Sequence, residues 1–309
     1  MTDAAATIEK PDNPYAEGAA FIDGDYLPIA EARIPIGDWG FLRSDVTYDV
    51  VAVWHGGFFR LADHLDRFFR GIERLHMSSP HDREALTGIL SECVRLSGLR
   101  EAYVEMILTR GVPPAGSRDP RKCENRLYAL AIPYVWIADP TKQDEGLHLV
   151  ISRVPRISPE SVDPTVKNFH WGDMVQGLYE AYDRGGETAV LTDGRGNITE
   201  GPGFNLFASI GGRLVTPASG VLLGITRKTV IELAETLNAK VEVGTLSEAE
   251  LRSADEIFMS STAGGVIPVT RLDGQPIGDG TPGPLAGRLR EMYWQAHDDP
   301  AYVTPIDYR

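Results

Sequence analysis

Cysteine is scarce in this sequence of 309 residues, and long apolar runs are missing. The two cysteines, Cys93 and Cys123, are too few for a disulfide framework or a zinc cage, so we expect no metal centre. No apolar run approaches the roughly 20 residues that a membrane-spanning helix needs. The first residues are polar and lack the apolar core of a signal peptide. We therefore expect a cytoplasmic protein that does not act on a membrane.

Basic residues are outnumbered by acidic ones. The chain has 30 lysines and arginines against 44 aspartates and glutamates, and its net charge of −14 argues against a nucleic-acid-binding surface. Lysine is the scarcer base, because the sequence contains only Lys10, Lys122, Lys142, Lys167, Lys228 and Lys240. Any chemistry that requires a lysine amine therefore has a short list of candidates.

The hydrophobic patterns predict two α+β domains. With 42% hydrophobic residues, the chain has ample apolar material for two cores. We expect a flexible segment over residues 1–18, a small strand-rich domain over 19–137, a polar linker over 138–146 and a larger domain over 147–309. The larger domain is expected to be centred on a mostly antiparallel sheet or barrel.

Turn and capping residues place several elements more closely. The pairs 23–24 (Asp-Gly) and 211–212 (Gly-Gly) lie between short apolar runs, as in β-hairpins. A helix is expected from about Asp82 to Ser97, with Gly98 ending it. Thr226 is expected to cap a further helix.

Lys167 differs from the other lysines because its neighbours are apolar and aromatic. It lies in the segment Pro164-Thr-Val-Lys-Asn-Phe-His-Trp171, whereas the others lie in polar loops, in the leading segment or at helix ends. Burial lowers the pKa of a lysine and leaves a neutral amine that can attack a carbonyl, as a Schiff-base enzyme requires. The alternative is a surface lysine whose stem lies along a buried strand.

Glu200 is a second candidate for chemistry, since glycines surround it in Thr199-Glu-Gly-Pro-Gly-Phe204. Glycines allow a flat ligand to approach the backbone closely. A carboxylate at such a place can hold a pyridine nitrogen protonated, which makes the ring an electron sink. The alternative is a hairpin with an exposed glutamate.

Three further segments could hold a phosphate group. The segment Gly224–Thr226 offers free amides and a hydroxyl at a helix start. Arg67 could add a charged clamp, and the small polar run 260–265 could supply more donors. The alternatives are a capped helix without a ligand, a solvated arginine and an ordinary loop.

In their order along the chain, these segments resemble the fold-type IV enzymes that use pyridoxal 5′-phosphate (PLP), which include branched-chain and D-amino-acid aminotransferases. More narrowly, the sequence is similar to the (R)-selective amine transaminases. The segments that carry the resemblance are ARIPIGDWGFLRSDVTYDV, FFRLADHLDRF, YVEMILTRG, DPTVKNFHWGD, LTDGRGNITEGPGFNLF, GVLLGITRKTV and DEIFMSSTAGGVIPVT. The resemblance implies a small α/β N-terminal domain, a larger C-terminal pseudo-barrel domain, and a homodimer with active sites at its interface.

The resemblance also implies roles for individual residues. It implies that Lys167 is the catalytic residue, which would carry the cofactor as a Schiff base and move the proton between substrate carbon and cofactor. The residues implied to hold the cofactor are Arg67, Lys167, Glu200, Leu222, Gly224, Ile225, Thr226, Ser261 and Thr262. The residues implied to face the substrate are Arg43, Tyr48, Val50, Tyr103, Glu105, Trp171 and Ala263.

The expected reaction is ping-pong transfer of an amino group from an (R)-configured amine or D-amino acid to a keto acid such as pyruvate. Three other activities use the same Lys167 and Glu200. They are D-amino-acid transamination, branched-chain amino acid transamination and a PLP lyase reaction of the aminodeoxychorismate type. A ligand-binding protein without catalysis would have no need to retain both residues.

Arg43 is the open point in substrate choice. Related enzymes usually carry a histidine there, and arginine binds carboxylates with two parallel hydrogen bonds. Arg43 could therefore bind a substrate carboxylate, or it could pair with a nearby acid such as Asp45 or Glu105. Arg118 and Arg121, in the polar loop, are the other candidates for binding a keto acid carboxylate.

Overall fold

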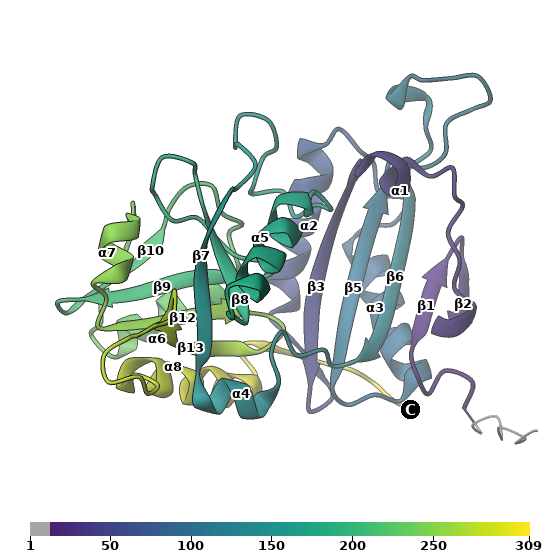
Figure 1. The fold of residues 1–309 in the computed structure, drawn as a ribbon. Coiled ribbons are helices and arrows are strands. Elements are labelled where there is room, and N and C mark those ends of the chain that lie inside the picture. The colour runs from purple at the N-terminus through teal and green to yellow at the C-terminus, as the bar shows by residue number, and fades with distance from the viewer. Residues whose placement is uncertain (1–12) are drawn as a thin grey trace, which may run out of the picture.

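The computed structural model describes residues 13–309, which form two β-sheets with helices packed against them (Figure 1). This arrangement confirms the predicted α+β class. Most of the flexible segment expected over 1–18 lies outside the described residues. Its last part forms turns, and the Asn13 side chain donates a hydrogen bond to the Leu96 carbonyl at 2.9 Å.

The first sheet has seven strands in the order β15-β4-β3-β5-β6-β1-β2, and every neighbouring pair is antiparallel. Its strands are β1 (Ala19–Ile22), β2 (Asp25–Pro28), β3 (Val46–Trp54), β4 (Gly57–Phe59), β5 (Ala102–Thr109), β6 (Arg126–Pro133) and β15 (Val303–Pro305). The other elements of this part are η1 (Ile29–Glu31), α1 (Trp39–Arg43), α2 (Leu61–Arg74), α3 (Arg83–Ser97) and η2 (Pro120–Lys122).

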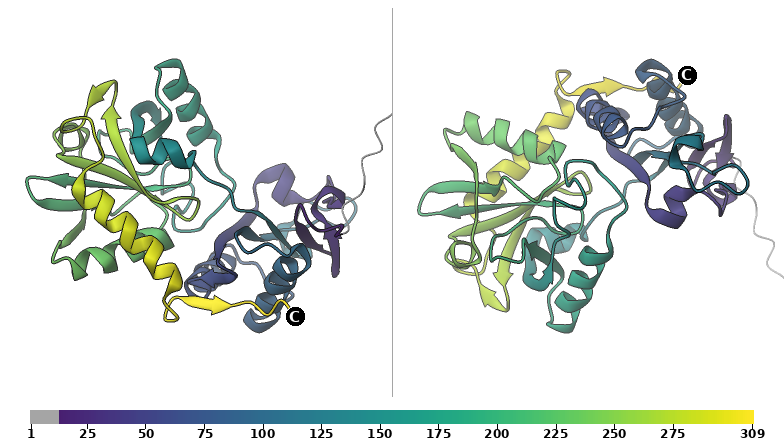
Figure 2. Two further views of the ribbon diagram at one scale, coloured as in Figure 1. Left: turned by 90° about the horizontal axis from the view of Figure 1, so that it is seen from below. Right: turned by 90° about the horizontal axis from the view of Figure 1, so that it is seen from above.

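Helices α2 and α3 cover one face of this sheet and enclose its hydrophobic core. The predicted ends of α3 are confirmed, because the Asp82 side chain accepts the Ala85 amide at 2.9 Å and Gly98 ends the helix with φ of 72°. The hairpin predicted at 23–24 joins β1 and β2. The other face of the sheet is turned toward the second half of the chain (Figure 2).

The second sheet has eight strands in the order β11-β10-β9-β12-β13-β7-β8, with β14 paired to β13. Its strands are β7 (Leu147–Pro155), β8 (Thr188–Thr192), β9 (Asn205–Ile210), β10 (Arg213–Pro217), β11 (Val241–Gly244), β12 (Glu256–Ser261), β13 (Gly265–Leu272) and β14 (Gln275–Pro276). The helices are α4 (Pro140–Glu145), α5 (Gly172–Asp183), α6 (Ile225–Thr236), α7 (Glu248–Arg252), α8 (Pro284–Gln295) and η3 (Ala296–Asp298).

The second sheet is mixed, which corrects the prediction of a mostly antiparallel one. The pairs β10–β11, β13–β7 and β7–β8 are parallel, which makes half of the pairs along the main path parallel. Helix α5 connects β7 to β8, and α6 connects β10 to β11, as parallel neighbours require. The hairpin predicted at 211–212 is confirmed between β9 and β10.

Two segments between and beyond the sheets differ from their predicted descriptions. Residues 138–146, expected as a polar linker, contain helix α4, whose Gln143 is fully buried. The chain end does not stay with the second sheet, because β15 pairs with β4 in the first (Figure 2). Within residues 13–309, no helix has the length and apolar character needed to cross a membrane.

Candidate active site

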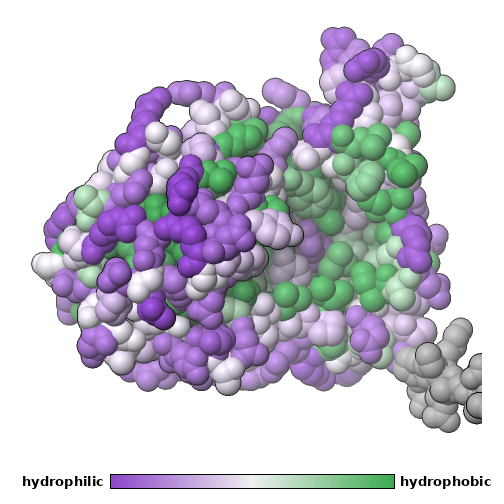
Figure 3. Space-filling model, in the orientation of Figure 1, coloured by the Kyte–Doolittle hydropathy of each residue, from purple (hydrophilic) through white to green (hydrophobic). Residues whose placement is uncertain are grey.

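A cavity of about 540 Å³ lies where the two sheets meet. Strand β3 and strand β5 of the first sheet contribute Tyr48, Val50 and Tyr103 to its wall. The rest of the wall comes from several other segments, among them Arg67 of α2, the loop before α5, the segment between β8 and β9, the start of α6 and the end of β12. Figure 3 shows the hollow between the two halves, with hydrophobic surface on the side of the first sheet.

Lys167 lies in this cavity, on the loop between β7 and α5. Its backbone carbonyl accepts hydrogen bonds from the Tyr48 amide at 3.1 Å and the Thr47 hydroxyl at 3.0 Å, which fix the loop against β3. Its amine lies 4.3 Å from the centre of the Tyr48 ring. The side chain is half-buried, so the amine can reach a ligand in the cavity.

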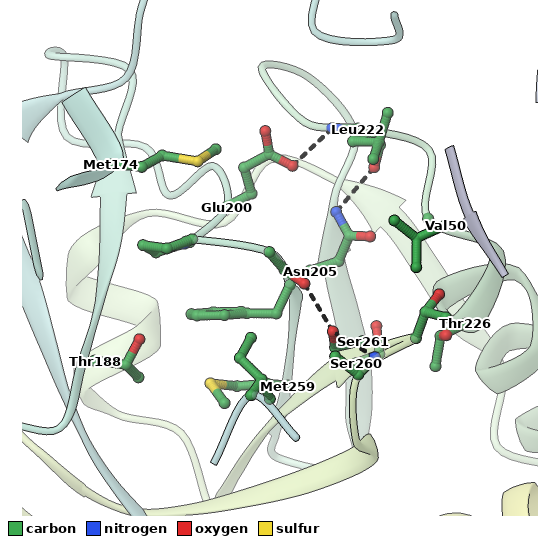
Figure 4. Close-up of a pocket in the computed structure, with 18 of the residues that line it drawn as sticks. Val50, Met174, Thr188, Glu200, Asn205, Leu222, Thr226, Met259, Ser260 and Ser261 are labelled. Carbon is green, nitrogen blue, oxygen red and sulfur yellow. Dashed lines mark hydrogen bonds between the residues drawn. The ribbon is translucent and has the colours of Figure 1, made fainter. Parts of the chain in front are cut away.

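Glu200 lies in the same cavity and is only 4% exposed. The Leu222 amide donates to one carboxylate oxygen at 2.7 Å (Figure 4), and the Arg156 Nε donates to the other oxygen at 3.3 Å. Burial raises the pKa of Glu200, and the positive charge of Arg156 opposes that rise. The next residue, Gly201, has to be glycine because a Cβ there would lie 2.4 Å from the Ala189 carbonyl oxygen. The alternative of an exposed glutamate is thus wrong.

Arg156 and Asp173 complete the surroundings of Glu200, and neither was predicted from the sequence. The Nη1 of Arg156 donates to Asp173 at 2.7 Å, and the same carboxylate oxygen accepts the Ile157 amide at 2.7 Å. Arg156 is 9% exposed and lines the cavity. An arginine directly after a buried strand, with an acid in the first turn of the next helix, is the signal that could have identified them.

The N-terminus of α6 faces the cavity on another side. Gly224 is the N-cap of this helix and Ile225 its first residue, so the prediction that Thr226 is the cap is wrong. Thr226 lies in the first turn, and its hydroxyl is 3.4 Å from the Tyr293 hydroxyl. A side chain at Gly224 would lie 2.1 Å from the Asn205 amide oxygen, which explains the glycine. The unpaired amides of this first turn favour an anion.

Arg67 adds a positive charge beside this helix start. Its guanidinium donates to both oxygens of Asp49 at 2.7 Å and to the Leu223 carbonyl at 3.1 Å. Burial alone would raise the pKa of Asp49, but the bonds from Arg67 and His64 outweigh it and hold that pKa well below its usual range. Arg67 is therefore a buried, oriented cation, and the alternative of a solvated arginine is wrong.

The end of β12 supplies small polar groups on the same side as α6. Ser261 donates to the Gly203 carbonyl at 2.8 Å (Figure 4). Ser260 lines the cavity, and its hydroxyl is buried without a hydrogen-bond partner among the described residues. Thr262 and Ala263 follow in the wall. A buried hydroxyl without a partner is costly, so a ligand atom in the cavity is its natural partner.

The residues expected to face a substrate fall into two groups. Tyr48, Val50, Tyr103, Trp171 and Ala263 line the main cavity. Glu105 is the register partner of Val50 across β3 and β5, so both side chains point to the same face of the sheet. Burial raises the pKa of Glu105 to about 7, although the charge of Lys167 lowers it in part.

Arg43 does not line the main cavity. It lines a second cavity of about 350 Å³ beside Asn168, and its guanidinium lies 3.6 Å from the centre of the Trp39 ring. Asp45, suggested as its partner, instead pairs with Arg110 at 2.9 Å.

The loop arginines also lie away from the main cavity. Arg118 and Arg121 are exposed on the loop that projects beside α1 (Figure 1). Arg121 pairs with Asp119 at 2.7 Å. Within the described chain, the arginines that line the main cavity are Arg67 and Arg156, and both are bound to acids.

The cavity thus has an amine, a buried carboxylate near one side and, near another side, a helix start with the Arg67 cation beside it. Such a set can hold a flat ligand that carries a phosphate and a basic ring nitrogen, with a carbonyl carbon near the amine. The parts of the chain that form this set of groups are Lys167, Glu200, Leu222, Arg67 and the start of α6.

Comparisons with known proteins agree with this chemistry. Residues 47–272 match the family model described as amino-transferase class IV. The chain is 30% identical, over 88% of its length and 94% of the relative's, to a putative branched-chain-amino-acid aminotransferase of Methanocaldococcus jannaschii. It is 25% identical to a D-alanine aminotransferase of Staphylococcus haemolyticus, over 88% of this chain and 95% of that one. A branched-chain amino acid aminotransferase solved with pyridoxamine 5′-phosphate has a TM-score of 0.88 and 28% identity, covering 94% of this chain and 99% of that chain.

Proposed function

Because this chain belongs to the class IV aminotransferases, a family of PLP enzymes, we propose that it transfers an amino group from an (R)-configured amine or a D-amino acid to a keto acid such as pyruvate. The observation that carries the proposal is the placement of the Lys167 amine in one cavity with the buried Glu200 carboxylate and the start of α6. Lys142 also lines the cavity, but its amine is paired with Glu145 and Glu187.

The residues of the cavity fit PLP. Its phosphate would be held by Arg67 and by the first turn of α6, at Gly224, Ile225 and Thr226, with Ser261 and Thr262 beside them. Glu200 would bind the ring nitrogen, Leu222 would pack against the ring, and Lys167 would bind the cofactor covalently. When bound, PLP withdraws electrons from the substrate carbon that carries the amino group.

Lys167 is the proposed acid and base of the reaction. Once its amine is released, Nζ takes the proton from the substrate carbon and later returns one. The bonds from Tyr48 and Thr47 to the Lys167 carbonyl keep the backbone still while the side chain moves. The donor's product leaves before the keto acid enters, so one site serves both substrates in ping-pong order.

On the side formed by this chain, the wall of the main cavity favours a substrate that has no carboxylate. Tyr48, Val50 and Tyr103 supply aromatic and apolar contacts, and Arg67 and Arg156 are already bound to acids. The D-alanine and branched-chain relatives support the alternative of an amino acid substrate. For that alternative, Arg43, Arg118 or Arg121 would have to bind the carboxylate.

An exposed apolar surface supports the proposal of a homodimer. Ile34, Ile36, Phe41, Leu42 and Val135 are 46%, 79%, 62%, 56% and 44% exposed. Such a surface is costly in water and typical of a contact with another chain. Val135 also lines the main cavity, so the contact would adjoin the active site. We propose that this dimer works in the cytoplasm.

Lys167→Ala tests the chemistry. We expect the variant to lose transamination and to retain no cofactor after borohydride reduction and denaturation, because no amine remains to be trapped. Lys240→Ala, an exposed lysine after α6, is the matched control and should behave as wild type. Trapping of the cofactor in Lys167→Ala would refute the assignment.

Three substrate pairs then test specificity in the holoenzyme. They are (R)-1-phenylethylamine with pyruvate, D-alanine with 2-oxoglutarate, and L-valine with 2-oxoglutarate. Turnover of the first pair is the expected result. Turnover of only the second or third pair would replace the amine substrate by the corresponding amino acid, and turnover of none would favour the lyase.

A further inference from the structure

Arg156 is a buried cation that the reaction described above does not use. It follows β7 directly, and its side chain is 6% exposed. Its Nε lies 3.3 Å from Glu200 and its Nη1 lies 2.7 Å from Asp173. Burying an arginine requires compensation, which the two carboxylates supply. The guanidinium therefore joins Glu200 to the first turn of α5.

The charges around Glu200 are few and can be named. Arg156 and Lys167 are the positive groups that act on its carboxylate, and the Leu222 amide donates to it at 2.7 Å. Asp173 forms an ion pair with the Nη1 of Arg156 and partly neutralises its positive charge. With so little solvent, removal of one charge changes the proton affinity of Glu200 strongly.

We propose that Arg156, through its positive charge beside Glu200, is a positioning residue that keeps the proton between Glu200 and the cofactor ring nitrogen on the nitrogen. This inference rests on the proposed function, since it assumes that Glu200 binds the ring. A carboxylate bound to a guanidinium is a weaker base, so it leaves the proton to the ring. Without Arg156, the buried carboxylate takes the proton and the ring nitrogen becomes a neutral acceptor.

The consequence for the reaction follows from the location of that proton. A protonated ring withdraws electrons from the substrate carbon more strongly than a neutral ring. Arg156 therefore supports proton removal by Lys167 without touching the substrate. A purely structural Arg156, which only joined β7 to α5, would affect folding and leave the location of the proton unchanged.

The test follows the ring nitrogen by NMR in holoenzyme loaded with nitrogen-15-labelled PLP. In wild type we expect the protonated chemical shift. In Arg156→Met we expect the nitrogen-15 chemical shift of the ring to move most of the way to the value of neutral pyridine. Transamination should fall by roughly ten-fold for each unit by which the pKa of Glu200 rises. Arg156→Lys, which keeps the charge, should restore most of the wild-type shift.

Two variants separate the charge of Arg156 from its structural role. Asp173→Asn removes the anchor but keeps the guanidinium charge, so the ring nitrogen should stay protonated. Arg153→Met removes an arginine of β7 whose side chain is 85% exposed, and it should leave the ring-nitrogen shift unchanged. An unchanged ring nitrogen in Arg156→Met, or an equal change in Asp173→Asn, would overturn the inference.

Glu200→Gln distinguishes failure of this inference from failure of the proposed function. If Glu200→Gln moves the ring-nitrogen shift and Arg156→Met does not, only the role of Arg156 is refuted. If Glu200→Gln leaves the shift at the wild-type value, Glu200 does not bind the ring and the proposed site itself is wrong. Thermal melting of each apoprotein shows which variants fold.

Discussion

At the scale of single residues, Glu105 shows how position changes the chemistry of a side chain. It lies on β5 opposite Val50, on the sheet face that borders the main cavity. Burial and the negative charge of Asp49 raise its pKa, Lys167 lowers it, and the result is about 7. Glu105 is therefore mostly neutral below about pH 7 and negatively charged above it.

This ionisation leads to a prediction about substrate charge. Above pH 7 the Glu105 carboxylate repels a substrate carboxylate, whereas an amine substrate has no such group. The ratio of kcat/KM for D-alanine to kcat/KM for (R)-1-phenylethylamine should fall by about ten-fold as the pH rises through 7. The reason is that two negative charges in a site this buried repel each other by more than about 1 kcal/mol. Glu105→Gln should remove that fall. An identical pH dependence in the variant would show that Glu105 does not act on the substrate.

At the scale of elements, the two helices of the proposed phosphate site are tied together. Arg60, directly before α2, donates to Glu232 on α6 at 2.6 Å, to the Thr229 hydroxyl at 3.0 Å and to Asp63 at 2.6 Å. Helix α2 carries Arg67, and the start of α6 faces the same cavity. The Arg60 contacts thus hold the two parts of the proposed phosphate site, Arg67 and the start of α6, at a constant separation before any ligand binds.

Loss of this link should be measurable in both stability and cofactor binding. Arg60→Met should lower the free energy of unfolding by about 1–3 kcal/mol, less than for a fully buried pair because Asp63 and Glu232 are partly exposed. PLP should bind several-fold more weakly. Lys228→Ala removes a half-exposed partner of the same Asp63 and should cost less than about 1 kcal/mol. Equal costs in denaturant unfolding would contradict the role given to Arg60.

At the scale of the whole molecule, the main cavity depends on how the two halves of the chain meet. Lys167 is held against β3 by Thr47, which lies 120 residues away in the sequence. The chain end returns to the first sheet through β15, and Tyr308 donates to the Leu99 carbonyl at 2.8 Å. These contacts fix the halves relative to each other, while the apolar surface beside the cavity remains exposed (Figure 3).

The proposed homodimer gives a prediction for that surface. Replacing both Phe41 and Leu42 with aspartate should convert the dimer to a monomer, because it puts charges into a contact that excludes water. Transamination should fall with dimer content, since the proposed site adjoins the contact. Val243→Asp, at a 51% exposed position of β11, is the control and should leave the mass unchanged. Sedimentation velocity measures the mass of the double variant and of the control. A monomeric wild type would contradict the proposal.

The sequence by itself determined the local elements and the candidates for chemistry. Helix α3 begins after Asp82 and ends at Gly98 as predicted, because capping and a positive φ depend on neighbouring residues alone. The hairpin at 211–212 formed for the same reason. Because the chain has only six lysines, few residues besides Lys167 can supply an amine, and the order of the motifs predicts its partners.

Only the tertiary structure decided which side chains meet. Arg156 lies 44 residues from Glu200, and no local pattern predicts that contact. Gly224, and not Thr226, is the N-cap of α6, where a Cβ would lie 2.1 Å from the Asn205 amide oxygen. Arg43 lies in the second cavity instead of the main one. Such contacts depend on how distant segments share buried space, so their energies arise only when the sheets and helices pack together.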